Sequence, residues 1–227
     1  MSIFSIILAR GGSEGIPNKN IHPINDKPLI YYTINQCIEA GIENIYTSSD
    51  SEEILEIASR FGSKKIYRPQ EFATNCSSSE EAWIHAINTI GSINFETDWI
   101  FAPQVTSPLR HSSDIKNACK IALSEEFDSL LSVVKFEDFF LWNDDGQKLS
   151  SINHDFKKRK RRQDINSKTL LENGSFYMFK PKGIIETNNR LHANIGYIEM
   201  ERYKMYQIDD YDDIPVVEYF LNKHNIS

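Results

Sequence analysis

The sequence predicts an α/β protein of Rossmann-like, three-layer α/β/α architecture with a mostly parallel sheet. Short apolar runs, which are typical of buried strands, alternate with segments whose apolar residues recur at helical spacing. Such alternation indicates βαβ units, whose right-handed crossovers pack helices against the sheet. The length of 227 residues suits one domain of this kind, and the chain shows no internal repeat and no low-complexity linker.

The first half of the chain carries the regular alternation. An apolar run is followed by a helix that has Pro28 near its start and Gly41 at its end. The predicted strands cover residues 4–9, 42–48, 99–102 and 129–134, and further helices cover residues 52–61, 79–90 and 113–123. Because ligands bind at the carboxyl ends of parallel strands, we expect the loops after Ala9, Ser48 and Ala102 to share one rim.

The pattern breaks between residue 136 and about residue 172, which we interpret as an inserted arm. This stretch carries aromatic residues, a turn sequence at residues 143–146 and six adjacent cations at residues 157–162. Adjacent like charges repel one another, so we expect the basic run on a solvated face of the arm. The later pattern predicts strands over residues 174–179, 195–200 and 206–208 and a last helix over residues 213–223.

Composition argues against several classes of function. The 32 acidic residues outnumber the 25 basic ones, and the formal net charge of −7 disfavours a general binder of nucleic acid or of membrane surfaces. No segment approaches the roughly 18–20 apolar residues of a membrane helix. The three cysteines form no CxxC pair, which argues against a disulfide framework and a zinc site. We therefore expect a reduced, cytoplasmic protein that binds neither nucleic acid nor membranes.

The loop after the first strand is the most informative segment. Three glycines within residues 8–20 let backbone N–H groups approach a phosphate closely, and Arg10 and Lys19 bring two positive charges to the same loop. The loop is neither a Walker loop nor a dinucleotide fingerprint, because it contains no G-x-x-x-x-G-K-[ST] and no G-x-G. These residues favour a triphosphate site, and a flexible loop with ordinary surface charges is the alternative.

Five motifs support a more specific reading. Residues 9–20, ARGGSEGIPNKN, resemble the nucleotide-binding signature A-R-G-G-S-K-G-I-P-x-K-N of the acylneuraminate cytidylyltransferase family, with Glu14 in place of lysine. The other four follow in the family's order and are RPQEFA at 68–73, QVTSPLR at 104–110, RQ at 162–163 and NGSFY at 173–177. The resemblance implies a fold like that of nucleotide-diphospho-sugar transferases and one cytidylyltransferase domain over residues 1–227, with the arm at about 136–172.

The resemblance also implies an activity and its residues. Members of this family transfer CMP from CTP to the anomeric hydroxyl of a sialic-acid-like nonulosonic acid and release pyrophosphate, a reaction that depends on charge neutralisation and positioning. By motif match, Arg10, Lys19 and Gln104 take the catalytic positions. The positions implied for CTP are Leu8, Ala9, Arg10, Gly11, Gly12, Ser13, Lys19, Asn20, Arg68, Ser78 and Ser79, and those implied for the sugar are Gln104, Thr106, Ser107, Arg162, Gln163, Asn173 and Tyr177.

The family's cofactor is Mg²⁺, held by two aspartates before the last helix. The second of them matches Asp209, whereas Gln207 stands in the place of the first. Mg²⁺ often takes one or two carboxylates together with phosphate oxygens and water, so Asp209 is the predicted metal ligand. The alternative role of Asp209 is a negative charge at the N-terminus of the last helix.

The resemblance further implies a homodimer, and it leaves the sugar open. In relatives the region of the arm covers the active site of a second copy. Leu171 stands where many relatives carry an arginine near the sugar or phosphate, so the identity of the nonulosonic acid is undecided. A cytidylyltransferase for another α-keto acid sugar such as Kdo is one alternative, and a CTP-binding relative with lost or altered turnover is another.

Overall fold

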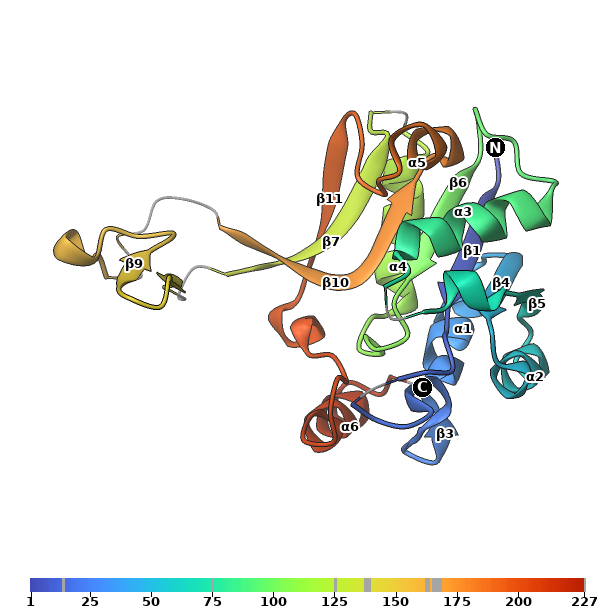
Figure 1. Ribbon diagram of the computed structural model, residues 1–227, viewed down its shortest axis with the longest axis horizontal. Coiled ribbons are helices and arrows are strands. Elements are labelled where there is room, and N and C mark those ends of the chain that lie inside the picture. Colours follow the sequence, from blue (N-terminus) through green and yellow to red (C-terminus); the bar gives the residue numbers. More distant parts are fainter. Residues whose placement is uncertain are drawn as a thin grey trace.

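The central sheet has the mostly parallel order that the sequence predicts. The computed structural model describes residues 1–13, 15–74, 76–124, 126–136, 140–161, 164 and 169–226. Its main strands are β1 (Ile3–Leu8), β4 (Asn44–Ser49), β5 (Lys64–Tyr67), β6 (Trp99–Pro103), β7 (Ser129–Lys135), β10 (Leu170–Phe179) and β11 (Ile195–Met200). Within the described residues they form one seven-stranded sheet in the order β11-β7-β10-β6-β1-β4-β5 (Figure 1). Neighbouring strands pair in parallel except beside β10, which runs antiparallel to β6 and β7.

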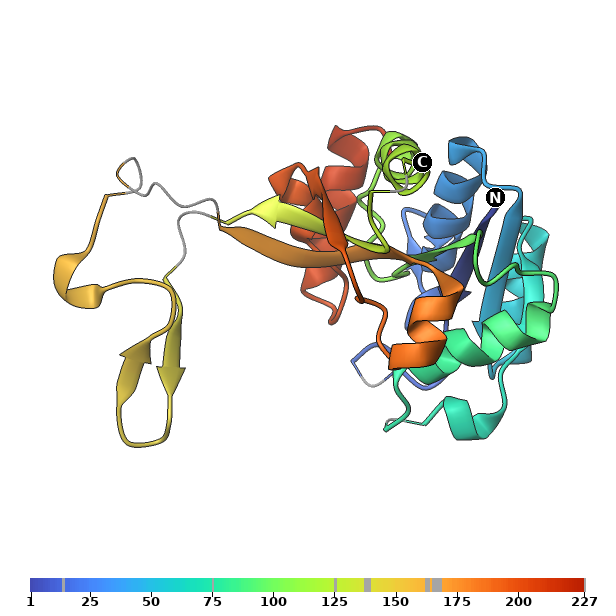
Figure 2. The same cartoon turned by 90° about the horizontal axis from the view of Figure 1, so that it is seen from above.

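Helices cover both faces of the sheet, which confirms the three-layer prediction (Figure 2). One face packs against α1 (Leu29–Ala40), α2 (Glu52–Arg60), α4 (Ser112–Ala122) and α6 (Asp213–Lys223), and the other packs against α3 (Ser79–Ile90) and α5 (Pro181–Thr187). Side chains of a strand alternate between its faces, so Ile7 of β1 lies in the first core whereas Phe4 and Ile6 lie in the second. No helix in the described ranges is long and apolar enough to cross a membrane.

The loops after the parallel strands meet at one rim, as expected from the sequence. The Ala9 N–H donates to the Ser48 oxygen at 3.0 Å, and the Gly11 N–H donates to Asp50 Oδ1 at 2.9 Å. These two bonds join the loop after β1 to the end of β4. At the same rim α2 begins, where the Ser51 hydroxyl accepts from a backbone N–H of its first turn.

Three details of the fold differ from the sequence prediction. The strand predicted over residues 206–208 is wrong, because this segment is an extended loop between a 3₁₀ turn, η5 (Arg202–Met205), and α6. Its Ile208 N–H donates to the oxygen of Thr106, which lies in a loop rather than in a neighbouring strand. Strand β5 and helix α5 were not predicted, because β5 is a short edge strand in which only Ile66 is buried and α5 has seven residues.

Strand β10 contains an irregularity that shapes the site. Its pairing with β7 shifts register in mid-strand, where Gly174 has a φ of +64°. Such a bulge takes backbone groups out of the ladder. The oxygen of Asn173, at the bulge, accepts from the Gln207 side chain, whereas the Ser175 oxygen accepts from the backbone N–H of Gln104 and so continues the pairing of β10 with β6.

Residues 140–161 lie apart from the sheet in both views (Figures 1 and 2). Here β8 (Trp142–Asp144) and β9 (Leu149–Ser151) form a two-stranded antiparallel hairpin. The rings of Phe140 and Trp142 lie against His154, and Trp142 also contacts Phe156. This projecting segment falls within the stretch that the sequence marks as an inserted arm.

Candidate functional site

A cleft of about 520 Å³ opens at the rim where β1 and β6 end and α3 begins. Its size is typical of small-molecule sites, which span roughly 300–1,000 Å³. The predicted site residues on its wall are Leu8, Arg10, Ser13, Lys19, Asn20, Arg68, Ser78, Ser79, Gln104, Thr106 and Asp209. The fold therefore brings residues from five separate stretches of sequence to one surface.

The other predicted residues do not form this wall, and two of them fall outside the described residues. Those that do not form the wall are Ala9, Gly11, Gly12, Ser107, Asn173 and Tyr177. Ser107 and Asn173 are only 1% and 2% exposed, so their side chains pack within the protein. Arg162 and Gln163 fall outside the described residues. Ligand contacts of all these residues stay predictions.

The glycine-containing loop is held by side chains from two directions. Asp50, at the end of β4, accepts the Gly11 N–H, and the Asn20 amide donates to the oxygen of Arg10 at 2.9 Å. Asn20 thus shapes the loop backbone as well as lining the cleft. A side chain at Gly12 would meet no atom within 4 Å, so the space beside Gly12 is open.

Three cations face the cleft from different elements. Arg68 is 4% exposed, and its guanidinium donates to the hydroxyl of Ser48 at 3.1 Å and to its backbone oxygen at 2.6 Å. Burial lowers the pKa of Arg68 to about 10, so the group stays charged at neutral pH. The Lys19 ammonium pairs with Asp209 at 3.0 Å, and Arg10 donates to a backbone oxygen on the cleft wall. An acidic chain therefore concentrates positive charge in one cleft.

The N-terminus of α3 forms another part of the wall. Ser78 caps this helix, because its hydroxyl accepts the Glu81 N–H at 3.1 Å while the Glu81 carboxylate accepts the Ser78 N–H at 2.9 Å. Ser79 follows as the first helical residue. The partial positive charge of the helix end adds to the attraction for an anionic ligand.

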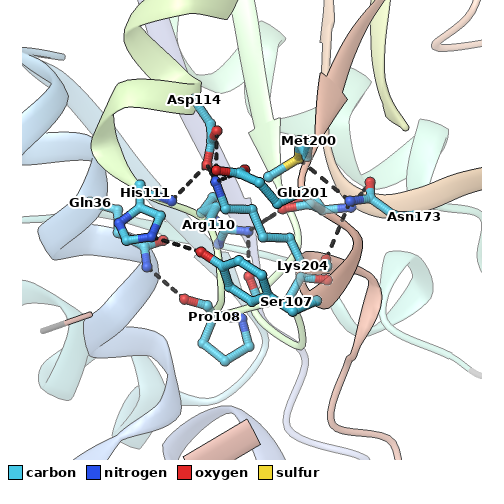
Figure 3. A network of polar contacts seen from close by, with 12 residues as sticks. Gln36, Ser107, Pro108, Arg110, His111, Asp114, Asn173, Met200, Glu201 and Lys204 are labelled. Atoms are coloured by element: carbon cyan, nitrogen blue, oxygen red, sulfur yellow. Dashed lines mark hydrogen bonds and ion pairs between the residues drawn. The ribbon is translucent and has the colours of Figure 1, made fainter. Parts of the chain in front are cut away.

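Two hydrogen bonds hold the backbone of Gln104 in place. Its N–H donates to the oxygen of Ser175 at 3.0 Å, and its own oxygen accepts from Arg110 at 3.0 Å. Arg110 is fully buried and also donates to the oxygen of Ser107 (Figure 3). It donates to the Thr33 hydroxyl as well. The side-chain amide of Gln104 has no hydrogen-bond partner within the described ranges, and it lines the cleft. It is available to a ligand.

Lys204 is another buried cation close to the rim. The Lys204 ammonium lies 2.9 and 2.8 Å from the two carboxylate oxygens of Asp114, and the Asn173 amide donates to the backbone oxygen of Lys204 (Figure 3). Asn173 therefore acts here as a link between the bulge of β10 and η5. Sequence reasoning missed Lys204, because an isolated lysine is ordinarily exposed.

Asp50 and Arg110 were also missed as supporting residues. The position of Asp50 offered a usable signal, because it directly follows a predicted parallel strand on the binding rim. Arg110 stands in the third motif, yet nothing local in the sequence indicates that its guanidinium is buried. Its partners, such as Thr33 and Ser175, come from α1 and β10.

Asp209 lies where a metal ion bound with a triphosphate could reach it. Its carboxylate is 73% exposed, and it lines the cleft beside Lys19. The residues that the structure describes contain no cluster of three or more metal-ligating side chains. One exposed carboxylate fits Mg²⁺ that takes its remaining ligands from phosphates and water. At the N-terminus of α6, the carboxylate that accepts backbone N–H groups is that of Asp213, which accepts from Asp209 and Asp210.

Comparisons with known proteins agree on one family of sequences. A family model described as Cytidylyltransferase matches residues 4–202. N-acylneuraminate cytidylyltransferase A of Danio rerio is 35% identical over 221 residues, which are 95% of this chain and 50% of that protein. Pseudaminic acid cytidylyltransferase of Campylobacter jejuni subsp. jejuni is 30% identical over 220 residues, which are 94% of both proteins. The chain thus spans about half the length of the first relative and nearly all of the second.

A solved structure shares the fold. A CMP:2-keto-3-deoxy-manno-octonic acid synthetase complexed with CTP superposes with a TM-score of 0.74 over 99% of this chain and 100% of that chain. The sequence identity of that pair is 12%, so the likeness concerns the fold alone.

Proposed function

Because the chain belongs to the cytidylyltransferase family, we propose that it transfers CMP from CTP to the anomeric hydroxyl of a nonulosonic acid and releases pyrophosphate. The family expected from the five motifs is confirmed. The observation that carries the proposal is the cleft itself, in which three cations of the described residues converge beside the amide of Gln104, which has no hydrogen-bond partner among those residues. Cations suit a triphosphate, and an amide can both donate to and accept from a sugar hydroxyl.

The proposed reaction is an in-line displacement at the α-phosphorus of CTP. The anomeric oxygen of the sugar forms a bond to this phosphorus, the bond to the bridging oxygen of the β-phosphate breaks, and the hydroxyl proton passes to solvent. Arg10 and Lys19 would bind the phosphates and stabilise the departing pyrophosphate, whose negative charge grows as it leaves. Gln104 would orient the attacking hydroxyl.

The cofactor is proposed to be Mg²⁺ held by Asp209 and the phosphates. When bound, the ion neutralises charge on the triphosphate and polarises its oxygens. The Lys19 ammonium, which pairs with Asp209 in this structure, can then turn to the phosphates. By holding the ion, Asp209 would bring positive charge to the side of the leaving pyrophosphate, and the Lys19 ammonium would add its own charge there.

The proposed sugar is a sialic-acid-like nonulosonic acid. This choice rests on the relatives, one named for N-acylneuraminate and another for pseudaminic acid. A Kdo-type sugar stays the alternative substrate. We also propose a cytoplasmic homodimer, because the arm exposes large apolar side chains such as Trp142, Leu149 and Phe156, which are 42%, 63% and 51% exposed.

The test is pyrophosphate release in the presence of Mg²⁺ and CTP, with ATP, GTP and UTP as nucleotide controls. The acid panel contains neuraminic, legionaminic, pseudaminic, deaminated neuraminic and Kdo acids. Release with CTP and one nine-carbon acid supports the proposal. CTP binding without release across the whole panel would refute it and favour a nucleotide-binding relative without turnover.

A further inference from the structure

The side-chain amide of Gln207 lies where three segments of the chain meet beside the cleft. Its Nε2 donates to the oxygen of Asn173 at 2.5 Å, and its Oε1 accepts from the Thr106 hydroxyl at 3.4 Å. Thr106 belongs to the loop after β6, Asn173 to the bulge of β10, and Gln207 itself to the loop before α6. One side chain therefore links segments that are far apart in sequence.

Neighbouring backbone atoms pack closely around the Gln207 amide. A Cβ at Gly174 would lie 2.8 Å from Gln207 Nε2, and Gly174 also has a positive φ that other residues rarely adopt. Asn173 is 2% exposed, so its backbone oxygen depends on donors from the protein. The neighbouring Ile208 is 1% exposed, and its N–H donates to the Thr106 oxygen at 2.8 Å. The backbone and the side chain thus fasten this loop at the same place.

We propose that Gln207 is a positioning residue that fixes Asp209 relative to the rim formed by Gln104 and Thr106. Thr106 follows Gln104 by two residues, and Asp209 follows Gln207 by two residues. Gln104 and Thr106 lie at a turn and both line the cleft. Residues two apart in an extended segment project to the same side, and the buried Ile208 between Gln207 and Asp209 agrees with this for the second pair. The amide therefore sets the separation between the predicted sugar contact and the predicted metal ligand, so this inference rests on the proposed function.

The amide is chemically suited to this bridge. It donates at one end and accepts at the other, whereas a carboxylate at this position would place a negative charge against the Asn173 oxygen. A neutral residue 207 also leaves Asp209 as the one carboxylate among the described residues that line the cleft, and Asp209 is already paired with Lys19. The geometry points to a metal ion that enters with the nucleotide phosphates rather than before them.

The test compares Gln207→Met with a matched control. Methionine keeps the length of the side chain and removes both hydrogen bonds. The control is Ser129→Ala at the start of β7, remote from the cleft, where the buried Ser129 hydroxyl donates to the His192 oxygen at 2.9 Å and accepts from the His192 N–H at 3.1 Å. Gln207→Met loses two partly buried hydrogen bonds and Ser129→Ala loses two buried ones, so we expect both to lower the midpoint of thermal unfolding by on the order of 5 °C.

The distinguishing readout is metal binding measured without the sugar. Electron paramagnetic resonance of Mn²⁺, a stand-in for Mg²⁺, gives its affinity for the protein alone and for the CTP complex. We expect wild-type protein to bind Mn²⁺ only with CTP, and Gln207→Met to weaken that binding by about tenfold, the equivalent of one or two hydrogen bonds. In turnover, KM for the acid should rise by a similar factor. Ser129→Ala should change neither quantity.

A second variant keeps the test decisive if Gln207→Met does not fold. Gln207→Glu retains the acceptor for Thr106 and loses the donor to Asn173, so its unfolding midpoint should fall as in Gln207→Met. A wild-type midpoint in Gln207→Glu would overturn the bridging role. Unchanged Mn²⁺ affinity in Gln207→Met, or an equal loss in Ser129→Ala, would overturn the positioning role. Failure of the proposed function appears separately, as absence of pyrophosphate release by the wild-type protein despite normal binding of Mn²⁺ and CTP.

Discussion

The ion pair between Lys204 and Asp114 allows a quantitative prediction of the unfolding free energy that is lost when the pair is broken. The Lys204 side chain is 1% exposed and that of Asp114 is 13% exposed. Two short contacts join the ammonium to the carboxylate, and the same carboxylate accepts the His111 N–H at 2.8 Å (Figure 3). Among the residues that the structure describes, the change Asp114→Ala therefore leaves the buried ammonium with the carboxylate of Glu201, which is 64% exposed, as its remaining ion-pair partner.

The expected loss follows from this geometry. Removing one partner of a buried ion pair costs about 3–5 kcal/mol, because the remaining charge stays desolvated. Since Glu201 still compensates part of the charge, the lower end, about 3 kcal/mol of unfolding free energy, applies. For a domain of this size, each kcal/mol corresponds to roughly 2–4 °C, so the unfolding midpoint should fall by about 6–12 °C.

The assay is thermal unfolding followed by circular dichroism, with the denaturant midpoint as a second measurement. Lys204→Met should cost less, because Asp114 keeps the His111 N–H and part of its hydration. The double variant Lys204→Met/Asp114→Leu should recover much of the loss, because an apolar pair carries no desolvated charge. A loss below about 1 kcal/mol for Asp114→Ala, or strictly additive effects in the double variant, would refute the reasoning.

The remaining predictions concern the cleft and the pH dependence of stability. Arg10→Ala should lower turnover by about 10²-fold or more, because a positioned charge on the phosphates is lost, and a near-wild-type rate would exclude that role. Gly12→Val should leave the unfolding midpoint unchanged, because the added atoms meet open space, yet it should weaken CTP binding measured by calorimetry; unaltered CTP affinity would contradict the placement of the nucleotide. Burial alone raises the pKa of Glu80, but its hydrogen bonds and charge interaction with Arg190 outweigh burial and hold the pKa below the ordinary 4.5. A lowered carboxyl pKa stabilises the fold above 4.5, and this contribution disappears as the pH falls through the lowered value. The difference in unfolding midpoint between wild type and Glu80→Gln should therefore be large at pH 6 and shrink towards pH 3. A difference that is constant with pH would show that ionisation of Glu80 beside Arg190 does not contribute to stability.

The sequence predicted the regular parts of the fold well, because local patterns determine them. Helix α3 begins and ends where its cap and periodicity indicate, with Ser78 before it and Gly91 after it. Helix α6 and strand β11 also have their predicted bounds. The strand predicted over residues 206–208 is wrong, because a polar residue between two apolar ones resembles the alternation of a strand even when the segment pairs with a loop.

Much of the candidate site could be predicted in the same way. The residues predicted to bind phosphates occupy a contiguous loop after a strand, so their order in the sequence indicates them, and Arg10 and Lys19 do line the cleft. Supporting residues leave no such local pattern. Arg110 and Lys204 become interior cations only because carbonyls and carboxylates from other elements surround them.

The sequence by itself determined the family, the strand and helix periodicities and the loop that faces the cleft, since each depends on residues that are neighbours along the chain. Only the tertiary structure decided how β10 inserts antiparallel between β6 and β7, where its Ser175 oxygen accepts from Gln104 and the Asn173 oxygen at its bulge accepts from Gln207. Those contacts join residues 34 to 71 positions apart. Their geometry follows from the packing of whole layers, because a backbone group freed from one ladder must find its hydrogen-bond partner wherever the fold brings one.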